Sequence, residues 1–273
     1  MLKRILVPTD FSENARHACV FAQSLAKTIP GATLRLVHVF MPNIETEYPT
    51  MSTPVVDHLR VREDMLNEFA DEMGEKEREL LVGFAADELV RMSESYDIII
   101  MGTTGEGGVL SQWFGSVSSA VAQRAVCPVL LIPPDCTYRG FQQILYASSY
   151  DSVDKKMISK LLNFNNVFNA TVHFVHVRDT ADENAFVKTK EEIFRKLFAD
   201  GEPTFAFNMA EVDADSVQEG LSDYATEHRI NLVAMAHRQR GFWEGFFHRS
   251  QTKGMVLNAK NIPLLIFHLQ SES

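Results

Sequence analysis

Short, wholly apolar runs alternate with longer stretches that are apolar on one side only. In the first half of the chain, the apolar runs predict strands at 4–7, 34–39, 79–82, 97–101 and 129–133. The one-sided stretches predict helices at 12–28, 56–75, 84–94 and 116–125. Runs such as "RILV", "DIII" and "VLLI" are apolar throughout, which is typical of strands covered on both faces. This alternation predicts a parallel sheet with helical crossovers.

The second half of the chain repeats the first in the same order. Four pairs of segments carry the repeat: "RILVPTDFS" with "QILYASSYD", "LRLVHVF" with "VHFVHVR", "DIIIMG" with "NLVAMA", and "CPVLLIP" with "IPLLIFH". Prolines and polar residues interrupt the pattern between them, at "PPDCTYRG". The sequence therefore predicts two tandem domains, 1–135 and 140–270, each an α/β fold with a doubly wound parallel sheet.

In such a fold, ligands bind beyond the carboxyl ends of the strands, where the strand order reverses. In the first domain the segments at that place are "VPTD", "HVFMP" and the glycine-rich "MGTTGEGG". The glycine-rich segment is not a P-loop, because the pattern GxxxxGK[ST] is absent from the chain. A plain surface loop is the alternative interpretation.

Small and hydroxyl residues in this loop suit a phosphate. Gly102 and Gly105 would let backbone amides face an anion, and Gly115 would precede a helix whose first amides point the same way. Ser116 and Ser118 add hydroxyls that can cap the helix or bind phosphate oxygens. Asp10 follows the first strand and could bind ribose or, through water, a metal ion; capping the next helix is an equally open role for it.

Composition narrows the functional classes. The net charge of −10 argues against a nucleic-acid surface, and no apolar stretch is long enough to cross a membrane. The start of the chain does not have the pattern of a signal peptide. The three cysteines lack metal-ligand spacing and cannot all pair, so we expect a cytoplasmic protein. Cys19 is expected in the core, and His38 and His176 are expected to be structural.

The spacing Gly102-x2-Gly105-x9-Gly115-Ser116, with Pro8-Thr9-Asp10 and His38-Val39, resembles the nucleotide-binding motif of the universal stress protein family. The resemblance covers nearly the whole chain as a tandem pair. It implies a flavodoxin-like or Rossmann-like fold, of the adenine nucleotide alpha hydrolase-like type. It also implies ATP or another adenine nucleotide as ligand, with Mg²⁺ as a candidate companion.

Carried over by position, the resemblance assigns two groups of ligand residues in the first domain. Those beside the base and ribose are Pro8, Thr9, Asp10 and Val39. Those around the ribose and phosphates are Gly102, Thr104, Gly105, Gly115, Ser116, Val117 and Ser118.

The second domain departs from the motif. Ser149 stands in place of Asp10, and Ala236, Gln239 and Arg249 stand in place of the three glycines; only Ser250 is kept. Its loop, 237–249, carries aromatic and arginine side chains that either pack the vacated crevice or the domain junction, or form a docking patch for a partner. These are Phe242, Trp243, Phe246 and Phe247, with Arg238, Arg240 and Arg249.

We therefore expect a stress-response regulatory protein that binds one adenine nucleotide in its first domain. Residues 97–123 contain no lysine or arginine, which favours binding over phosphoryl transfer. A slow ATPase and a nucleotide-independent docking module are the alternatives. The apolar last strand of each domain would be an exposed edge, so we expect edge pairing and a homodimer.

Overall fold

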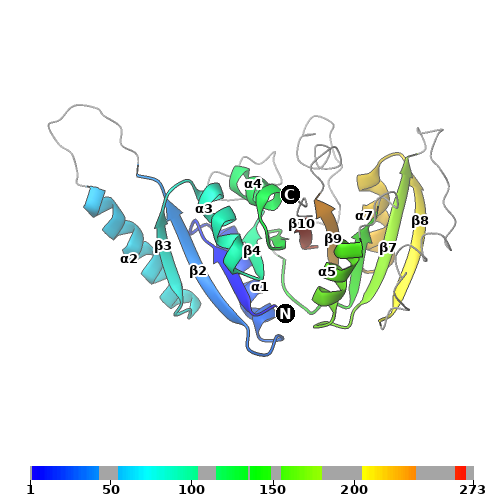
Figure 1. Ribbon diagram of the computed structural model, residues 1–273, viewed down its shortest axis with the longest axis horizontal. Helices are drawn as coiled ribbons and strands as arrows, with labels where there is room; N and C mark the ends of the chain where they lie inside the picture. The colour runs from blue at the N-terminus through cyan, green and yellow to red at the C-terminus, as the bar shows by residue number, and fades with distance from the viewer. Residues whose placement is uncertain are drawn as a thin grey trace. The chain divides into compact units, whose positions relative to one another are not determined.

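The computed structural model describes residues 2–42, 55–103, 115–134, 136–148, 155–179, 205–237 and 262–268. The chain divides into two compact units, Leu2–Asp135 and Cys136–Ser273 (Figure 1).

The sheet of the first unit has five parallel strands in the order β3-β2-β1-β4-β5. The strands are β1 (Arg4–Pro8), β2 (Thr33–Phe40), β3 (Arg78–Val82), β4 (Ile98–Gly102) and β5 (Val129–Ile132). The helices are α1 (Glu13–Ala26), α2 (Val55–Met73), α3 (Ala85–Met92) and α4 (Ser116–Arg124), with a 3₁₀ turn, η1, at Ser93–Ser95. All five strands and four helices predicted for this half are present, so the α/β prediction is confirmed.

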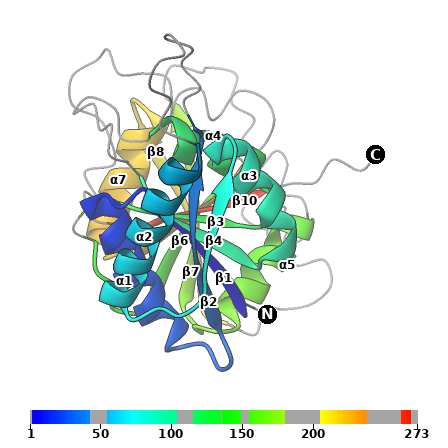
Figure 2. The ribbon, with the colours of Figure 1, turned by 90° about the vertical axis from the view of Figure 1, so that its left-hand side faces the viewer.

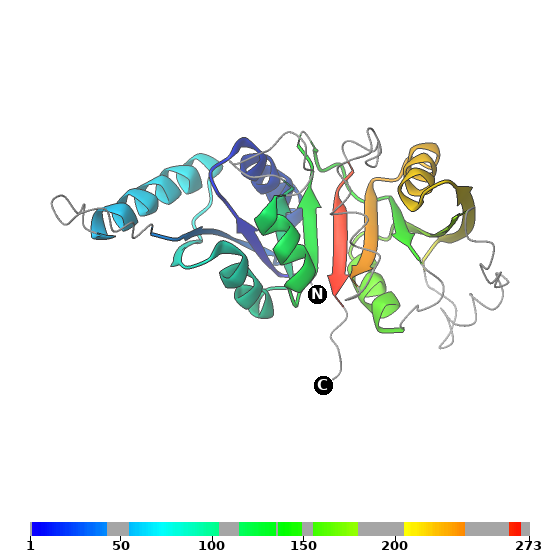
Figure 3. The ribbon, with the colours of Figure 1, turned by 90° about the horizontal axis from the view of Figure 1, so that it is seen from above.

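Helices cover both faces of this sheet. The pair α1 and α2 lies on one face, and the pair α3 and α4 lies on the other (Figures 2 and 3). The central strands are consequently buried on both sides: Ile5, Ile99 and Leu130 are completely inaccessible to solvent. This double cover explains why the strands read as unbroken apolar runs in the sequence.

The second unit has the same strand arrangement, in the order β10-β9-β6-β7-β8, again parallel. Its strands are β6 (Gln143–Ala147), β7 (Thr171–Asp179), β8 (Phe207–Ala214), β9 (Leu232–His237) and β10 (Leu264–His268). Two described helices, α5 (Lys155–Asn165) and α7 (Val217–Glu227), cover opposite faces of the sheet (Figure 3).

The repeat extends to individual hydrogen bonds. One carboxylate oxygen of Asp97 accepts the amides of Lys3 and Arg4, each at 2.8 Å, at the start of β1. In the second unit the side-chain oxygen of Asn231 accepts the amides of Gln142 and Gln143, each at 3.2 Å. An amide oxygen thus replaces a carboxylate oxygen in the same role, because both accept hydrogen bonds.

The cysteines are structural. Cys19, Cys127 and Cys136 are free thiols and all are buried, which confirms that Cys19 belongs to the core. Burial raises the pKa of the Cys19 and Cys127 thiols to about 12, and that of Cys136 to about 11.

None of the helices in the described ranges has the length and apolar character that crossing a bilayer requires.

Candidate functional site

The candidate site lies at the carboxyl edge of the first unit's sheet, where the strand order reverses. The chain runs outward from β1 through β2 to β3 and then returns to place β4 on the other side of β1. Ile5 pairs with Ile98 and Leu6 with Ile99, so β1 and β4 end side by side. The turn after β1 and the loop after β4 therefore start at neighbouring points, which is where doubly wound folds bind ligands.

The turn after β1 is held by Thr9 and His38. The amide of Thr9 donates to the carbonyl of Val37 at 2.8 Å, and its carbonyl accepts a 2.8 Å hydrogen bond from Nδ1 of His38. A carbonyl oxygen is only an acceptor, so Nδ1 carries the proton. His176 makes the equivalent bond to the carbonyl of Ser148 at 2.9 Å. The prediction that both histidines are structural is confirmed.

Asp10 supports the start of α1 without capping it. The N-cap is Ser12, whose hydroxyl oxygen accepts the amide of Ala15 at 3.2 Å. Oδ1 of Asp10 accepts from the hydroxyl of Ser12 at 2.6 Å and from its amide at 3.1 Å. The alternative in which Asp10 is the helix cap is wrong, because Ser12 occupies that position. A half-exposed carboxylate is thereby fixed at the carboxyl edge.

Phe11 adopts a backbone conformation unusual for a bulky residue, with φ at 67°. Its ring lies 4.3 Å from the ring of His38 and 5.8 Å from that of Phe69, between centroids. A left-handed conformation disfavours any residue with a Cβ, so these ring contacts must stabilise the turn. Sequence reasoning missed Phe11, since nothing in the local pattern distinguishes it from an ordinary apolar residue.

Gly102, the last residue of β4, lies directly beneath the first turn of α1. A Cβ built on Gly102 would lie 2.6 Å from Nδ2 of Asn14 and 3.1 Å from the Asn14 carbonyl oxygen. The first distance is shorter than real Cβ contacts, and the second is tight enough that the neighbouring atom would have to shift slightly. Sequence reasoning missed Asn14 altogether, and the small Cβ-free volume at Gly102 is already taken by this residue.

The loop after β4 is closed by hydrogen bonds between its two ends. The amide of Gly115 donates to the carbonyl of Thr103 at 2.7 Å, and the hydroxyl of Ser118 lies 2.9 Å from the same oxygen. Ser118 is buried, and its hydroxyl also lies 3.0 Å from the carbonyl of Gly115. A hydroxyl has one proton, so the proton of Ser118 is engaged by these carbonyls.

Gly115 is the N-cap of α4, as predicted from its place before "SVSSAV". The side chain of Ser116 is exposed, and that of Val117 is half-buried. Within the described residues the amides of Ser116 and Val117 have no acceptor, and the first turn of α4 carries no acidic residue. The helix therefore presents free N–H groups and the positive end of its dipole, the features that attract an anion.

The remaining predicted residues are placed as follows. Pro8 ends β1 and Val39 lies in β2, both half-buried at the same edge. Thr104 and Gly105 lie outside the described residues, as do Ser149, Gln239, Arg249, Ser250 and the aromatic loop from Arg238 to Arg249. Ala236 lies near the carboxyl end of β9 in the second unit, where it pairs with Phe267 of β10 in the sheet. No group of three or more His, Cys, Asp or Glu side chains suited to a metal ion occurs in the described ranges.

Comparison with known proteins gives a family match and several relatives, each covering about half of the chain. The model of the universal stress protein family matches residues 1–133. A universal stress protein of Methanocaldococcus jannaschii is 30% identical over 146 residues, covering 48% of this chain and 82% of that protein. One from Thermus aquaticus is 32% identical over 137 residues, covering 48% of this chain and 99% of that protein.

A solved structure matches the whole chain. A universal stress protein from Archaeoglobus fulgidus aligns with a TM-score of 0.68 over 98% of this chain and 97% of its own, at 16% identity. At that identity the likeness shows the fold, and it extends over both units. The motif, the doubly wound fold and the relatives together show that the chain belongs to the universal stress protein family.

Proposed function

We propose that the first unit binds one adenine nucleotide at the carboxyl edge of β1 and β4, and that the protein is a stress-response regulator rather than an enzyme. The observation that supports the proposal is that β1 and β4 end side by side, with the Asp10 carboxylate following β1 and the free amides of Ser116 and Val117 following the loop after β4. A ribose hydroxyl can donate to the carboxylate, while phosphate oxygens accept from the amides.

The described contacts refine the part each residue would play. Asp10 would bind the ribose, and Pro8 and Val39 would line the base. Both backbone groups of Thr9 are engaged, by Val37 and His38, so Thr9 would shape the turn. Ser116 and Val117 would hold the phosphates through their amides, with Gly115 ending the loop. Thr104 and Gly105 belong to the proposed phosphate loop by their place in the motif.

Hydrolysis is not the favoured outcome, because phosphoryl transfer relies on cations that neutralise developing charge. The segment 97–123 has no lysine or arginine, so a bound polyphosphate would need Mg²⁺ or another cation from solution. A turnover assay with ATP and Mg²⁺ tests this: sustained release of inorganic phosphate by the wild type, lost in Asp10→Ala, would make the protein a slow ATPase.

The test of binding is mass spectrometry of small molecules released from the purified protein, followed by calorimetry with AMP, ADP and ATP. We expect one nucleotide per chain, because the second unit has side chains at all three glycine positions of the motif. Asp10→Ala and Gly115→Leu should each abolish binding. Ser149→Ala, at the matching position of the second unit, is the control and should bind like the wild type.

Saturation near two nucleotides per chain, or unchanged affinity in both variants, would contradict the proposed site.

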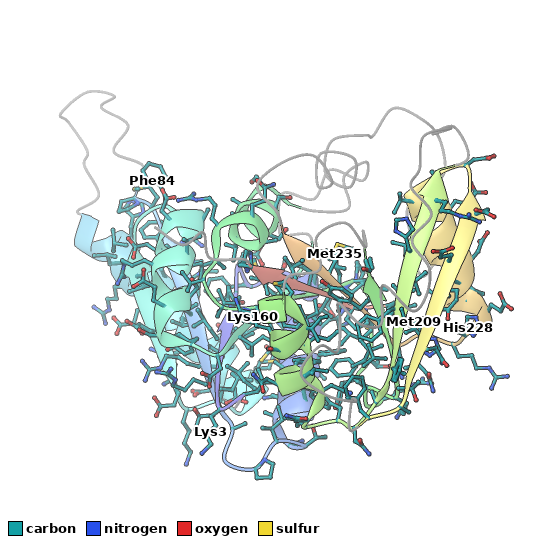
Figure 4. The ribbon with its side chains drawn as sticks, turned by 45° about the vertical axis from the view of Figure 1, so that its right-hand side comes forward. Lys3, Phe84, Lys160, Met209, His228 and Met235 are labelled. Atoms are coloured by element: carbon teal, nitrogen blue, oxygen red, sulfur yellow. The ribbon has the colours of Figure 1, made fainter. Side chains whose placement is uncertain are left out.

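The docking alternative has one observation in its favour. At the carboxyl end of β3, Val82 is 53% exposed and Phe84, which is labelled in Figure 4, is 68% exposed. If no nucleotide binds at all, this alternative is favoured.

A cytoplasmic location and a homodimer of whole chains are also proposed. The three free, buried thiols support a reducing compartment. Light scattering of the purified chain tests the dimer, and a constant monomer mass across concentrations would exclude it.

A further inference from the structure

The residue that Gly102 accommodates is Asn14, and this contact reaches the proposed ribose ligand. Asn14 lies in the first turn of α1, two residues after the N-cap Ser12. Ser12 in turn holds Oδ1 of Asp10 through its hydroxyl and its amide. The height of the first turn of α1 above β4 therefore determines where the Asp10 carboxylate lies.

The face of α1 turned to the sheet is built for a close approach. Its buried residues include Ala15, Ala18 and Ala22, the last two completely inaccessible to solvent. Small side chains let a helix lie close to its neighbour, so little room remains above the end of β4. A Cβ at Gly102 would lie 2.6 Å from Nδ2 and 2.9 Å from Cγ of Asn14.

The second unit shows the opposite combination. The first helix of that unit, α5, buries Met157 and Leu161 at the positions that match Ala18 and Ala22. Larger side chains hold a helix further from a sheet. The strand position that matches Gly102 is Ala236, which carries a Cβ. In the first unit, small side chains on the helix face toward the sheet thus occur together with glycine at the end of the strand. In the second unit, large side chains on that helix face occur together with alanine at the matching strand position.

We infer that Gly102 lacks a side chain in order to admit Asn14 and the first turn of α1, and that Gly102 is thereby a positioning residue for Asp10. The inference rests on the proposed nucleotide site but assigns Gly102 a different task from leaving room for the ligand. A Cβ at Gly102 would displace the buried Asn14 side chain and press on the Asn14 carbonyl oxygen 3.1 Å away, so we expect the first turn of α1, with Ser12 and the Asp10 carboxylate, to move.

The inference predicts rescue. Gly102→Ala should weaken nucleotide binding about tenfold, which corresponds to about 1.4 kcal/mol, because overpacking displaces the turn. Asn14→Ala removes the two closest atoms, so Gly102→Ala/Asn14→Ala should bind more tightly than Gly102→Ala alone, within about threefold of the wild type. Part of the loss should persist because the Asn14 carbonyl oxygen stays 3.1 Å from the added carbon. Ala236→Gly is the matched control in the second unit and should leave the affinity unchanged.

The inference is tested by calorimetric titration of these four variants and the wild type. Thermal unfolding and the NMR signal of the Ser12 amide are measured on the same proteins. The Ser12 amide should shift in Gly102→Ala and return in the double variant, with or without ligand. Wild-type affinity in Gly102→Ala, or a double variant as weak as Gly102→Ala, overturns the inference, since the second result would mean that the ligand itself needs the space. If the wild type binds no nucleotide, the proposed function fails, and the Ser12 amide still decides the positioning role of Gly102.

Discussion

The amide of Gly115 donates a 2.7 Å hydrogen bond to the carbonyl oxygen of Thr103, so both ends of the glycine-rich loop meet at one point. The loop is therefore anchored at the end of β4 and at the start of α4. The start of α4 is thereby held near the end of β4, and β4 ends beside β1, the strand that Asp10 follows.

Ser118→Ala tests the closure. The Ser118 hydroxyl lies 2.9 Å from the same Thr103 oxygen and is buried, so its loss should lower the free energy of unfolding by about 1 kcal/mol. Nucleotide binding should weaken as well, because the start of α4 loses a tether. Urea denaturation and calorimetry measure the two effects. The neighbouring Ser119→Ala is the control, and equal behaviour of the two variants would refute a special role for Ser118.

Gly220→Ala should destabilise the protein, against the usual preference of helices for alanine. Gly220 lies within α7, where alanine ordinarily stabilises by about 1 kcal/mol. Here the added Cβ would lie 2.8 Å from Cγ1 of Val177 and 3.1 Å from Cβ of Ala214. Overpacking of this kind costs about 1–3 kcal/mol, so we expect a net loss in urea denaturation.

Val177→Ala supplies the matching test for Gly220. It removes both Val177 methyl groups that the new carbon would contact. Gly220→Ala should therefore cost less in the Val177→Ala background than in the wild type. A stabilised Gly220→Ala single variant would show that α7 can shift away from β7 at little cost.

Asp97→Asn should be tolerated far better than Asp97→Ala. Asn231 makes the matching contacts with an amide oxygen, so an oxygen acceptor is what the start of β1 requires. Asp97→Ala leaves the amides of Lys3 and Arg4 without this acceptor and should cost about 1–3 kcal/mol in urea denaturation. A loss in Asp97→Asn as large as in Asp97→Ala would show that the charge matters instead.

The pH dependence of Asp97 follows from the same contacts. Burial opposes ionisation, but the hydrogen bonds from Arg4 and Lys3 outweigh it and lower the pKa of Asp97 below its ordinary value of 3.8. The carboxylate therefore stabilises the fold fully above pH 3.8, and this contribution is lost as the pH falls through the lowered pKa. Asp97→Asn should remove that part of the acid dependence.

His173 gives the second unit a pH dependence at milder acidity. Its Nδ1 lies 2.9 Å from the Tyr224 hydroxyl and its Nε2 lies 2.7 Å from Oε1 of Gln143. Burial first, and then the nearby His228, lower the pKa of His173 below 6.5 (Figure 4 labels His228). Protonation is thus unfavourable in the folded state, and it would require Tyr224 to accept a hydrogen bond from Nδ1.

The sign of this effect is fixed by linkage. Above pH 6.5 His173 is neutral in both states, and as the pH falls below 6.5 the unfolded chain binds a proton more readily. The free energy of unfolding should therefore decrease from about pH 6.5 downward, until the folded-state pKa is passed. His173→Gln should flatten this slope in urea denaturation at a series of pH values. An unchanged slope would mean that other histidines cause it.

The architecture, and the sheet edge proposed to bind the ligand, follow from the amino-acid sequence alone. Wholly apolar runs indicate strands that are buried on both faces. Their alternation with helices predicts a parallel sheet. In such a sheet the segments "VPTD" and "MGTTGEGG" follow the ends of neighbouring strands. The internal repeat is also visible in the sequence, because both copies bury the same positions and therefore keep apolar residues there. These features depend on local pattern and on the rules of parallel sheets, which a sequence carries directly.

The roles of the small residues depend on packing between elements that are far apart in the sequence. The sequence left the role of Asp10 open, and packing assigned the helix cap to Ser12. The sequence suggested that Gly102 leaves space for a ligand. In the structure, the space that a Cβ of Gly102 would occupy is taken by Asn14, from a helix distant in the sequence. The strained φ of Phe11 and the contact of Gly220 with Val177 were equally invisible. Such contacts depend on how closely a helix approaches a sheet, and that distance is set by many buried side chains together rather than by any local run of residues.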